Sequence, residues 1–171
     1  MTNASLDVHP LLAPSVVVTL GMAVVVGSAL GFEHIGGYIP CALCLLQRNP
    51  YYIGIPLGIL TILSVVLKLP ASVTRTLLVL IGLLMLVGGG MGIYHAGVEW
   101  KFWEGPASCS VSAAGVAAGA GNVLDQLNSV KGPSCTDATL RVFGLSFAGW
   151  NVLTSLALAA IAFAGATRKR V

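Results

Sequence analysis

Four cysteines carry the reactive chemistry of this 171-residue sequence, and they form two pairs of different spacing. Cys41 and Cys44 flank two residues in the motif CALC, a spacing that lets two sulfur atoms close a small disulfide ring. In such a motif the first thiolate can be stabilised and the second thiol can resolve a mixed disulfide. Structural disulfides and zinc knuckles use the same spacing, so a redox-active dithiol is one of three interpretations.

The second pair, Cys109 and Cys135, is widely spaced. A structural disulfide is the plainer interpretation of such an isolated pair. A four-cysteine zinc site is disfavoured, because structural zinc sites usually combine short-spaced ligands, and we expect no metal. A c-type haem is excluded because Leu45, not histidine, follows Cys44. The four cysteines alone allow three disulfide pairings.

Two further side chains could assist the first pair. Arg48 lies four residues beyond Cys44, which is the spacing of neighbours on one helix face. A cation at a membrane boundary is either an interfacial anchor or the partner of an anion, here a Cys44 thiolate or an oxygen of a bound electron acceptor. His95 lies at the outer end of the third apolar run, where histidine is also a common interface residue.

The composition places these residues in a membrane protein. The chain is 56% hydrophobic and 9% charged, and its mean hydropathy is +0.90. Soluble domains carry about 25% charged residues, and disordered chains lack such an apolar excess. The net charge of +3, with no basic run beside aromatic residues, argues against nucleic-acid binding. We therefore expect the lipid bilayer as solvent and no nucleic acid as partner.

Four uncharged apolar runs can each cross a bilayer, which takes roughly 20 residues. We expect one membrane domain over residues 1–171, with spans at about 11–32, 51–67, 77–94 and 142–166 and outer loops at about 33–50 and 95–141. The fold class is an all-α, antiparallel four-helix transmembrane bundle. Gly54 with Gly58, and Gly88 with Gly92, form small-xxx-small pairs that predict close helix packing. The segment 111–127 could form a short helix on the membrane surface.

Charge density predicts the orientation of the bundle. An even number of spans places both termini on one side, together with the connector 68–76. That side holds Lys68 and Arg75 in the short connector and the basic run 168–170 in the tail, which favours it as cytoplasmic. All four cysteines then fall on the opposite, periplasmic side, where disulfides persist.

Two dithiol pairs on one face of a membrane suggest a relay of electron pairs. One pair would exchange with a soluble protein and the other with an acceptor at the lipid boundary. A lipid-soluble quinone takes up two electrons and two protons, and the sequence contains no flavin or nucleotide motif that would offer another acceptor. Elimination therefore favours a membrane quinone as the acceptor.

The chain resembles the DsbB family of bacterial disulfide bond formation proteins over nearly its whole length. The resemblance rests on four spans, the motif PCALCLLQR at 40–48, the later Cys109 and Cys135, His95 at the end of the third run, and the segment FGLSFAGW at 143–150. It implies reoxidation of a periplasmic, thioredoxin-fold oxidase of the DsbA type. Electrons would pass to ubiquinone or menaquinone in the bacterial inner membrane.

The resemblance also implies a role for each site residue. Cys109 would be attacked by the partner's thiolate, and Cys135 would be its disulfide mate. Cys41 would exchange with that pair. Cys44 would face the quinone as a thiolate, with Arg48 supporting it and His95 near the quinone ring.

Two alternatives remain at this stage. A vitamin K epoxide reductase-like protein also couples thiols to quinones, but there the loop cysteines precede the membrane-proximal pair, whereas here Cys41 and Cys44 come first. A non-catalytic membrane protein would use both cysteine pairs as structural disulfides that brace its outer loops.

Overall fold

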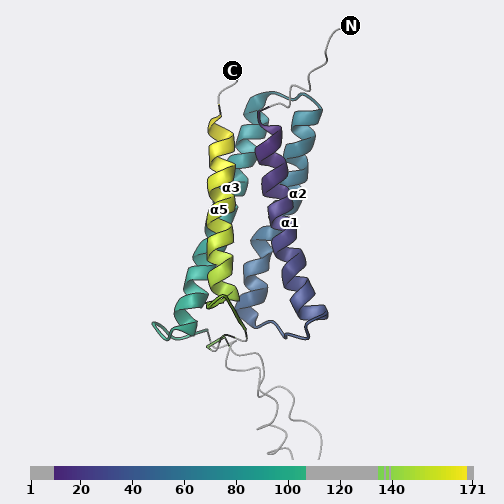
Figure 1. Ribbon diagram of the computed structural model, residues 1–171. Coiled ribbons are helices and arrows are strands. Elements are labelled where there is room, and N and C mark those ends of the chain that lie inside the picture. Colours follow the sequence, from purple (N-terminus) through teal and green to yellow (C-terminus); the bar gives the residue numbers. More distant parts are fainter. Residues whose placement is uncertain (1–9, 107–134, 137, 139, 169–171) are drawn as a thin grey trace, which may run out of the picture.

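The computed structural model describes residues 10–106, 135–136, 138 and 140–168. Within these parts, four long helices make up the molecule: α1 (Leu12–His34), α2 (Ala42–Val66), α3 (Ala71–Glu99) and α5 (Phe147–Thr167) (Figure 1). A two-stranded antiparallel hairpin, β1 (Arg141–Val142) and β2 (Leu145–Ser146), precedes α5. All four helices are long and apolar enough to cross a membrane. The predicted four-helix transmembrane bundle is therefore confirmed.

Successive helices run in opposite directions, so the start of α1 and the end of α5 lie at the same end of the bundle (Figure 1). The opposite end holds the α1–α2 connector, the end of α3 and the hairpin. Helix α3 packs against both α2 and α5, and α1 packs against α2 and α5 as well. This arrangement brings residues near position 41, 95 and 150 to one end of the molecule.

The helices extend beyond the apolar runs, which changes where the chemistry-bearing residues lie. Helix α2 begins at Ala42 rather than near residue 51, so the second half of the CALC motif lies in its first turn and Pro50 lies inside the helix. Helix α3 continues to Glu99, so His95 is a helical residue rather than a loop residue. Cys41 is the N-cap of α2, and its sulfur accepts a hydrogen bond from the backbone N–H of Cys44. This cap gives the helix a start that hydropathy alone does not mark.

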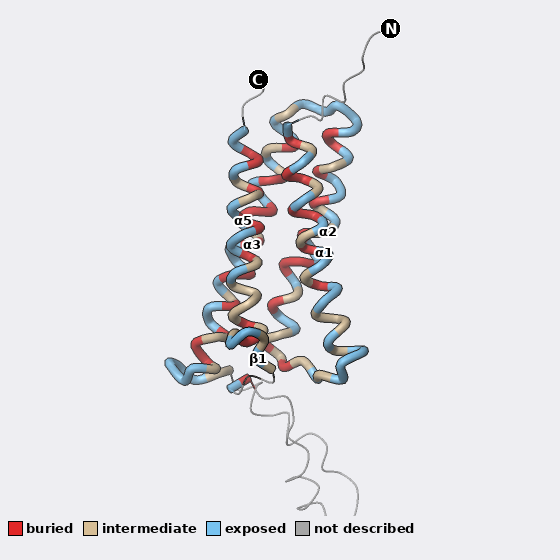
Figure 2. The backbone as a smooth tube through the Cα atoms, viewed as in Figure 1, coloured by how far each residue is buried: buried red, intermediate tan, exposed pale blue. Residues whose placement is uncertain are grey.

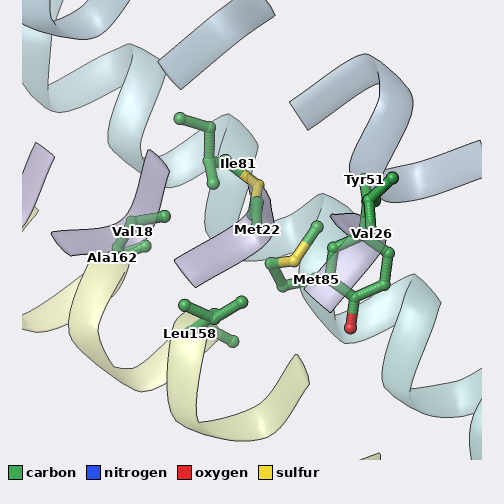
Figure 3. Close-up of a cluster of buried hydrophobic side chains, with 9 residues drawn as sticks. Val18, Met22, Val26, Tyr51, Ile81, Met85, Leu158 and Ala162 are labelled. Carbon is green, nitrogen blue, oxygen red and sulfur yellow. The ribbon is translucent and has the colours of Figure 1, made fainter. Parts of the chain in front are cut away.

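The interior of the bundle is a cluster of apolar side chains from all four helices, shown in Figure 3. The cluster comprises Val18, Met22, Val26, Tyr51, Ile81, Met85, Leu158, Ala159 and Ala162. The outward faces are also apolar, and Figure 2 shows them as long exposed stretches of each helix. Large apolar side chains on the outside are the arrangement expected when lipid, not water, surrounds a protein.

The glycine pairs lie where helices approach each other closely, as the small-xxx-small pattern predicts. A Cβ atom at Gly54 would lie 2.5 Å from Met22 Sδ on α1, and one at Gly58 would collide with the Thr19 side chain. On α3, a Cβ atom at Gly92 would lie 2.9 Å from Val152 of α5. These glycines therefore allow contacts within the bundle.

Gly58→Leu is expected to lower the stability of the bundle by about 1–3 kcal/mol or more, because the added side chain overfills the α1–α2 contact. Thermal unfolding of the purified protein in detergent, followed by circular dichroism, measures the effect. Gly27→Leu is the matched control, since a Cβ atom at Gly27 meets no atom within 4 Å. Equal unfolding temperatures for the two variants would contradict this account of the α1–α2 contact.

Candidate functional site

A buried dithiol lies at the start of α2. Cys41 and Cys44 are free thiols whose sulfur atoms are 3.2 Å apart, and Cys41 is 5% exposed. The Cys41 sulfur lies 3.4 Å from the backbone nitrogen of Cys44 and 3.6 Å from Nε2 of His95. The helix start supplies backbone N–H groups and the positive end of the helix dipole to the first sulfur of the motif.

These contacts lower the pKa of the Cys41 thiol to about 4. The largest cause is the hydrogen bond with the Cys44 thiol; burial acts in the opposite direction, and His95 and the Cys44 backbone N–H add to the lowering. The resemblance led us to expect the thiolate on Cys44. In this dithiol arrangement, the contacts favour Cys41, the residue that caps the helix, as the thiolate.

The alkylation rate of Cys41 is expected to rise far less between pH 6 and pH 8 than that of an ordinary thiol, because its pKa is lowered. An ordinary thiol with a pKa of about 8.5 would react about 75-fold faster at the higher pH, because only the thiolate reacts. The measurement uses iodoacetamide on a Cys44→Ser/Cys109→Ser/Cys135→Ser variant, in which the serine hydroxyl at position 44 can still donate. The same variant in denaturant is the control and should show the ordinary steep dependence. A steep dependence in the folded protein would contradict the lowered pKa.

A network of polar side chains continues from the dithiol into the bundle. Nδ1 of His95 lies 2.6 Å from Nε2 of Gln47, and Oε1 of Gln47 accepts a 2.7 Å hydrogen bond from Asn151 on α5. The Tyr51 hydroxyl donates to Oδ1 of Asn151 and lies 2.7 Å from the Ser155 hydroxyl. Buried polar groups in a membrane bundle are costly unless they are paired, and here α2, α3 and α5 pair them with one another.

A cavity of about 370 Å³ opens beside the dithiol between α1, α2 and α5. Its walls are mainly apolar, with Val24, Phe32 and Phe147 among them. Its polar lining consists mainly of Glu33, Cys44, Gln47, Arg48, Tyr51 and Asn151. Cys44 thus touches both Cys41 and the cavity, whereas Cys41 is not part of the cavity wall. The volume and the few polar groups are typical of a site for an organic molecule.

Arg48 lines this cavity and forms an ion pair with Glu33 near the end of α1. The two side chains are 12% and 26% exposed. The carboxylate partner explains how a cation is accommodated at this depth, because an unpaired charge there would be costly. Arg48 is therefore held by a specific partner, and it lines the same cavity as Cys44.

The structure brings Cys41, Cys44 and His95 together and places Arg48 in the adjoining cavity wall. Cys135 is disulfide-bonded and buried, and it belongs to a small apolar cluster with Cys41, Leu43 and Val98. Cys109 and the segment 111–127 lie outside the described residues. The ligand atoms of Cys41, Cys44 and His95 lie within 4.8 Å of one another, so these three side chains could also hold a thiophilic metal ion.

Sequence reasoning missed several polar residues of the site. Glu33, Tyr51, Glu99 and Asn151 all lie at or within the helices, and Asn151 carries the one side-chain amide of α5. A strongly polar residue inside a membrane span is itself a signal of function, because lipid penalises it unless it is paired. Applying that rule would have identified Asn151 before its partners were known.

A helical membrane bundle that holds a CALC dithiol beside an apolar cavity has the architecture of a membrane redox protein. The family model described as "Disulfide bond formation protein DsbB" matches residues 13–165. The chain is 31% identical over 153 residues to "Disulfide bond formation protein B" of Cupriavidus metallidurans, covering 84% of this chain and 85% of the relative. It is 33% identical over 132 residues to the protein of that name in Cupriavidus pinatubonensis, covering 75% of each.

An uncharacterized protein of Rickettsia prowazekii is 26% identical over 128 residues, covering 74% of this chain and 70% of the relative. No solved structure matches the chain. The chain belongs to the DsbB family of disulfide bond formation proteins. It is accordingly a multi-pass membrane protein of the disulfide-forming oxidoreductase class.

Proposed function

We propose that the protein is an inner-membrane thiol:quinone oxidoreductase that reoxidises a periplasmic oxidase of the DsbA type. One observation carries the proposal: Cys44 lies 3.2 Å from its redox partner Cys41 and also lines an apolar cavity that holds Arg48. A thiol in this position can exchange electrons with an acceptor in the cavity. The acceptor class is a membrane quinone, ubiquinone or menaquinone.

The cavity suits a quinone head group by its chemistry. Its wall joins apolar side chains to a cation, Arg48, and to amide and hydroxyl groups of Gln47, Asn151 and Tyr51. Apolar walls would accept the ring and its isoprenoid substituent, and Arg48 would donate a hydrogen bond to a carbonyl oxygen. When bound, the quinone supplies the capacity to take up two electrons and two protons.

Electrons would move in pairs through two thiol–disulfide exchanges and then a transfer to the quinone. The dithiol of the partner would reduce the Cys109–Cys135 disulfide, becoming a disulfide itself. The second-loop dithiol would then reduce a Cys41–Cys44 disulfide, and the resulting Cys41–Cys44 dithiol would return to the disulfide as the quinone becomes quinol. The burial of Cys135 in one cluster with Cys41 supports the second exchange, because thiol–disulfide exchange needs sulfur atoms that can approach in line.

The proposed orientation places the dithiol end of the bundle on the periplasmic side and both termini in the cytoplasm. The connector between α2 and α3 carries Lys68, and Arg75 lies in the first turns of α3, at the end opposite the dithiol. Basic residues favour the cytoplasmic side, and disulfide exchange needs an oxidising compartment.

The direct test follows quinone absorbance and partner thiols together, under anaerobic conditions. The purified protein in detergent is mixed with excess reduced DsbA-type partner and with ubiquinone or, separately, menaquinone. We expect one quinone reduced for each partner disulfide formed, over many turnovers. Partner oxidation that stops once the disulfides of the protein are consumed, with both quinones, would refute a quinone acceptor. No partner oxidation at all would favour structural disulfides.

A further inference from the structure

Two backbone carbonyls fix the direction of the buried hydrogen bonds beside the dithiol. The carbonyl oxygen of Gly88 can only accept, so the Asn151 side-chain atom 3.2 Å from it is the amide nitrogen Nδ2. The same Nδ2 lies 2.7 Å from Gln47. The Gln47 atom that faces it must therefore be the acceptor Oε1, and the Gln47 amide nitrogen points the other way.

A second carbonyl supports the same orientation independently. The Gln47 nitrogen Nε2 lies 3.3 Å from the carbonyl oxygen of Leu43, which again can only accept. The same nitrogen lies 2.6 Å from Nδ1 of His95. Nδ1 must then accept this hydrogen bond, so it carries no proton, and the single proton of the imidazole lies on Nε2.

We infer that Gln47 and Asn151 are positioning residues that hold the His95 ring proton on Nε2, which makes His95 a hydrogen-bond donor to the Cys41 sulfur and not an acceptor of its proton. Nε2 lies 3.6 Å from that sulfur, within the range of an N–H···S hydrogen bond. The inference deepens the proposed function, because it assigns a role to His95 at the dithiol.

The groups around Cys41 agree with a donor role for His95. The Cys41 sulfur receives the backbone N–H of Cys44 and faces Nε2 of His95, and the Cys44 thiol is its third polar neighbour. The other charged group at this histidine is Glu99 on α3, whose Oε1 lies 3.8 Å from Nε2. The N–H at Nε2 lies near both the Cys41 sulfur and the Glu99 carboxylate, and negative charge on either group stabilises it. Glu99 therefore also favours the proton on Nε2.

A proton on Nε2 of His95 favours a hydrogen-bonded Cys41 thiolate over a metal ion at this place. A metal ion bound by Cys41, Cys44 and His95 would need the lone pair of Nε2, since Nε2 is the ring atom that faces the sulfur. With the proton on Nε2, that lone pair is not available. A Cys41 thiolate carries no proton of its own, so an N–H donor at Nε2 stabilises it where a bound metal ion would otherwise be needed.

Nitrogen NMR tests the assignment directly. Histidine is labelled with ¹⁵N in the reduced protein, and a long-range ¹⁵N–¹H correlation spectrum at neutral pH distinguishes protonated from bare ring nitrogens. A His95→Asn variant identifies the His95 signals among those of His9 and His34. We expect a protonated Nε2 and a bare Nδ1. A proton on Nδ1, alone or together with one on Nε2, would overturn the inference.

Substitutions of Gln47 and Asn151 test whether these two residues hold the His95 proton on Nε2. Gln47→Glu replaces the amide by a group that accepts, so we expect a proton to appear on Nδ1. Asn151→Leu removes one of the two constraints on the Gln47 amide, and we expect the His95 signal to shift toward the Nδ1-protonated form. In the single-cysteine background, Asn151→Leu should also raise the pH midpoint of Cys41 alkylation by about one to two units, as expected for a lost charge-assisted hydrogen bond.

Thr61→Val is the matched control for both measurements. Thr61 is a buried polar residue of α2 whose hydroxyl donates to the carbonyl of Leu57 in its own helix, away from this network. It should leave the His95 signals and the alkylation midpoint unchanged. A bare Nδ1 in Gln47→Glu would contradict the inference. Because these readouts do not use turnover, they separate a wrong tautomer from a wrong quinone assignment.

Discussion

Cys44→Ser is expected to abolish quinone reduction while a single round of exchange with the reduced partner survives. Cys44 is the sulfur that lines the cavity, and a serine hydroxyl cannot form a disulfide with Cys41. The second-loop cysteines stay intact in this variant, so one disulfide remains to be passed to the partner. The loss of turnover should be at least about a thousandfold, as for removal of a covalent nucleophile.

Rapid mixing with an excess of reduced partner and of quinone measures both expectations. Partner thiols should fall by two per protein molecule, which corresponds to one disulfide, after which no further oxidation occurs, and quinone absorbance should stay constant. Cys41→Ser is the matched comparison and should also block quinone reduction, since the redox pair is broken from the other side. Steady quinone reduction by Cys44→Ser would show that electrons leave the protein by a route that avoids the cavity.

The sequence identified the cysteines, Arg48 and His95 because their residue types and spacings are rare in a chain with so few polar groups. Four apolar runs likewise predicted four helices, since few other structures can satisfy backbone hydrogen bonds in lipid. Both predictions rest on local properties of the chain. For Cys41, Cys44, His95 and Arg48, the structure adds the distances and the shared cavity wall that bring them to one end of the bundle.

The start of α2 could not be predicted from hydropathy. Gln47, Arg48 and Pro50 interrupt the apolar pattern, so the run was placed near residue 51, yet the helix begins at Ala42. Two of these residues find partners from other parts of the bundle: Asn151 for Gln47 and Glu33 for Arg48. Tertiary pairing therefore supports the helix through residues that hydropathy alone leaves outside the span.

The location of the dithiol follows from the same pairing. Because α2 starts early, Cys44 lies in its first turn and reaches the cavity, while Cys41 caps the helix outside the cavity wall. The two sulfurs thus have different surroundings at a separation of 3.2 Å. This asymmetry fits the proposed division of roles: Cys41 has the contacts that stabilise a thiolate, and Cys44 lines the cavity.

Arg48→Ala is expected to raise the KM for quinone by about tenfold or more while the bundle stays folded. A hydrogen bond from a charged donor contributes about 1.5–3 kcal/mol, and 1.4 kcal/mol corresponds to a factor of ten. Arg48 is the cationic donor among the residues that line the cavity, so no neighbour there replaces it. Steady-state kinetics at saturating partner and varied quinone, with thermal unfolding as the check on folding, measure both effects.

The ion pair with Glu33 requires a second variant before this result is assigned to Arg48 itself. Arg48→Ala leaves the Glu33 carboxylate in the cavity wall without its cation, and that charge alone would disfavour an electron-rich quinone oxygen. Arg48→Ala/Glu33→Gln removes both charges. If Arg48 contacts the quinone, the double variant keeps most of the increase in KM, and Glu33→Gln alone has little effect. A double variant with the KM of the unaltered protein would mean that Arg48 acts only by neutralising Glu33, and its proposed contact with the quinone would be wrong.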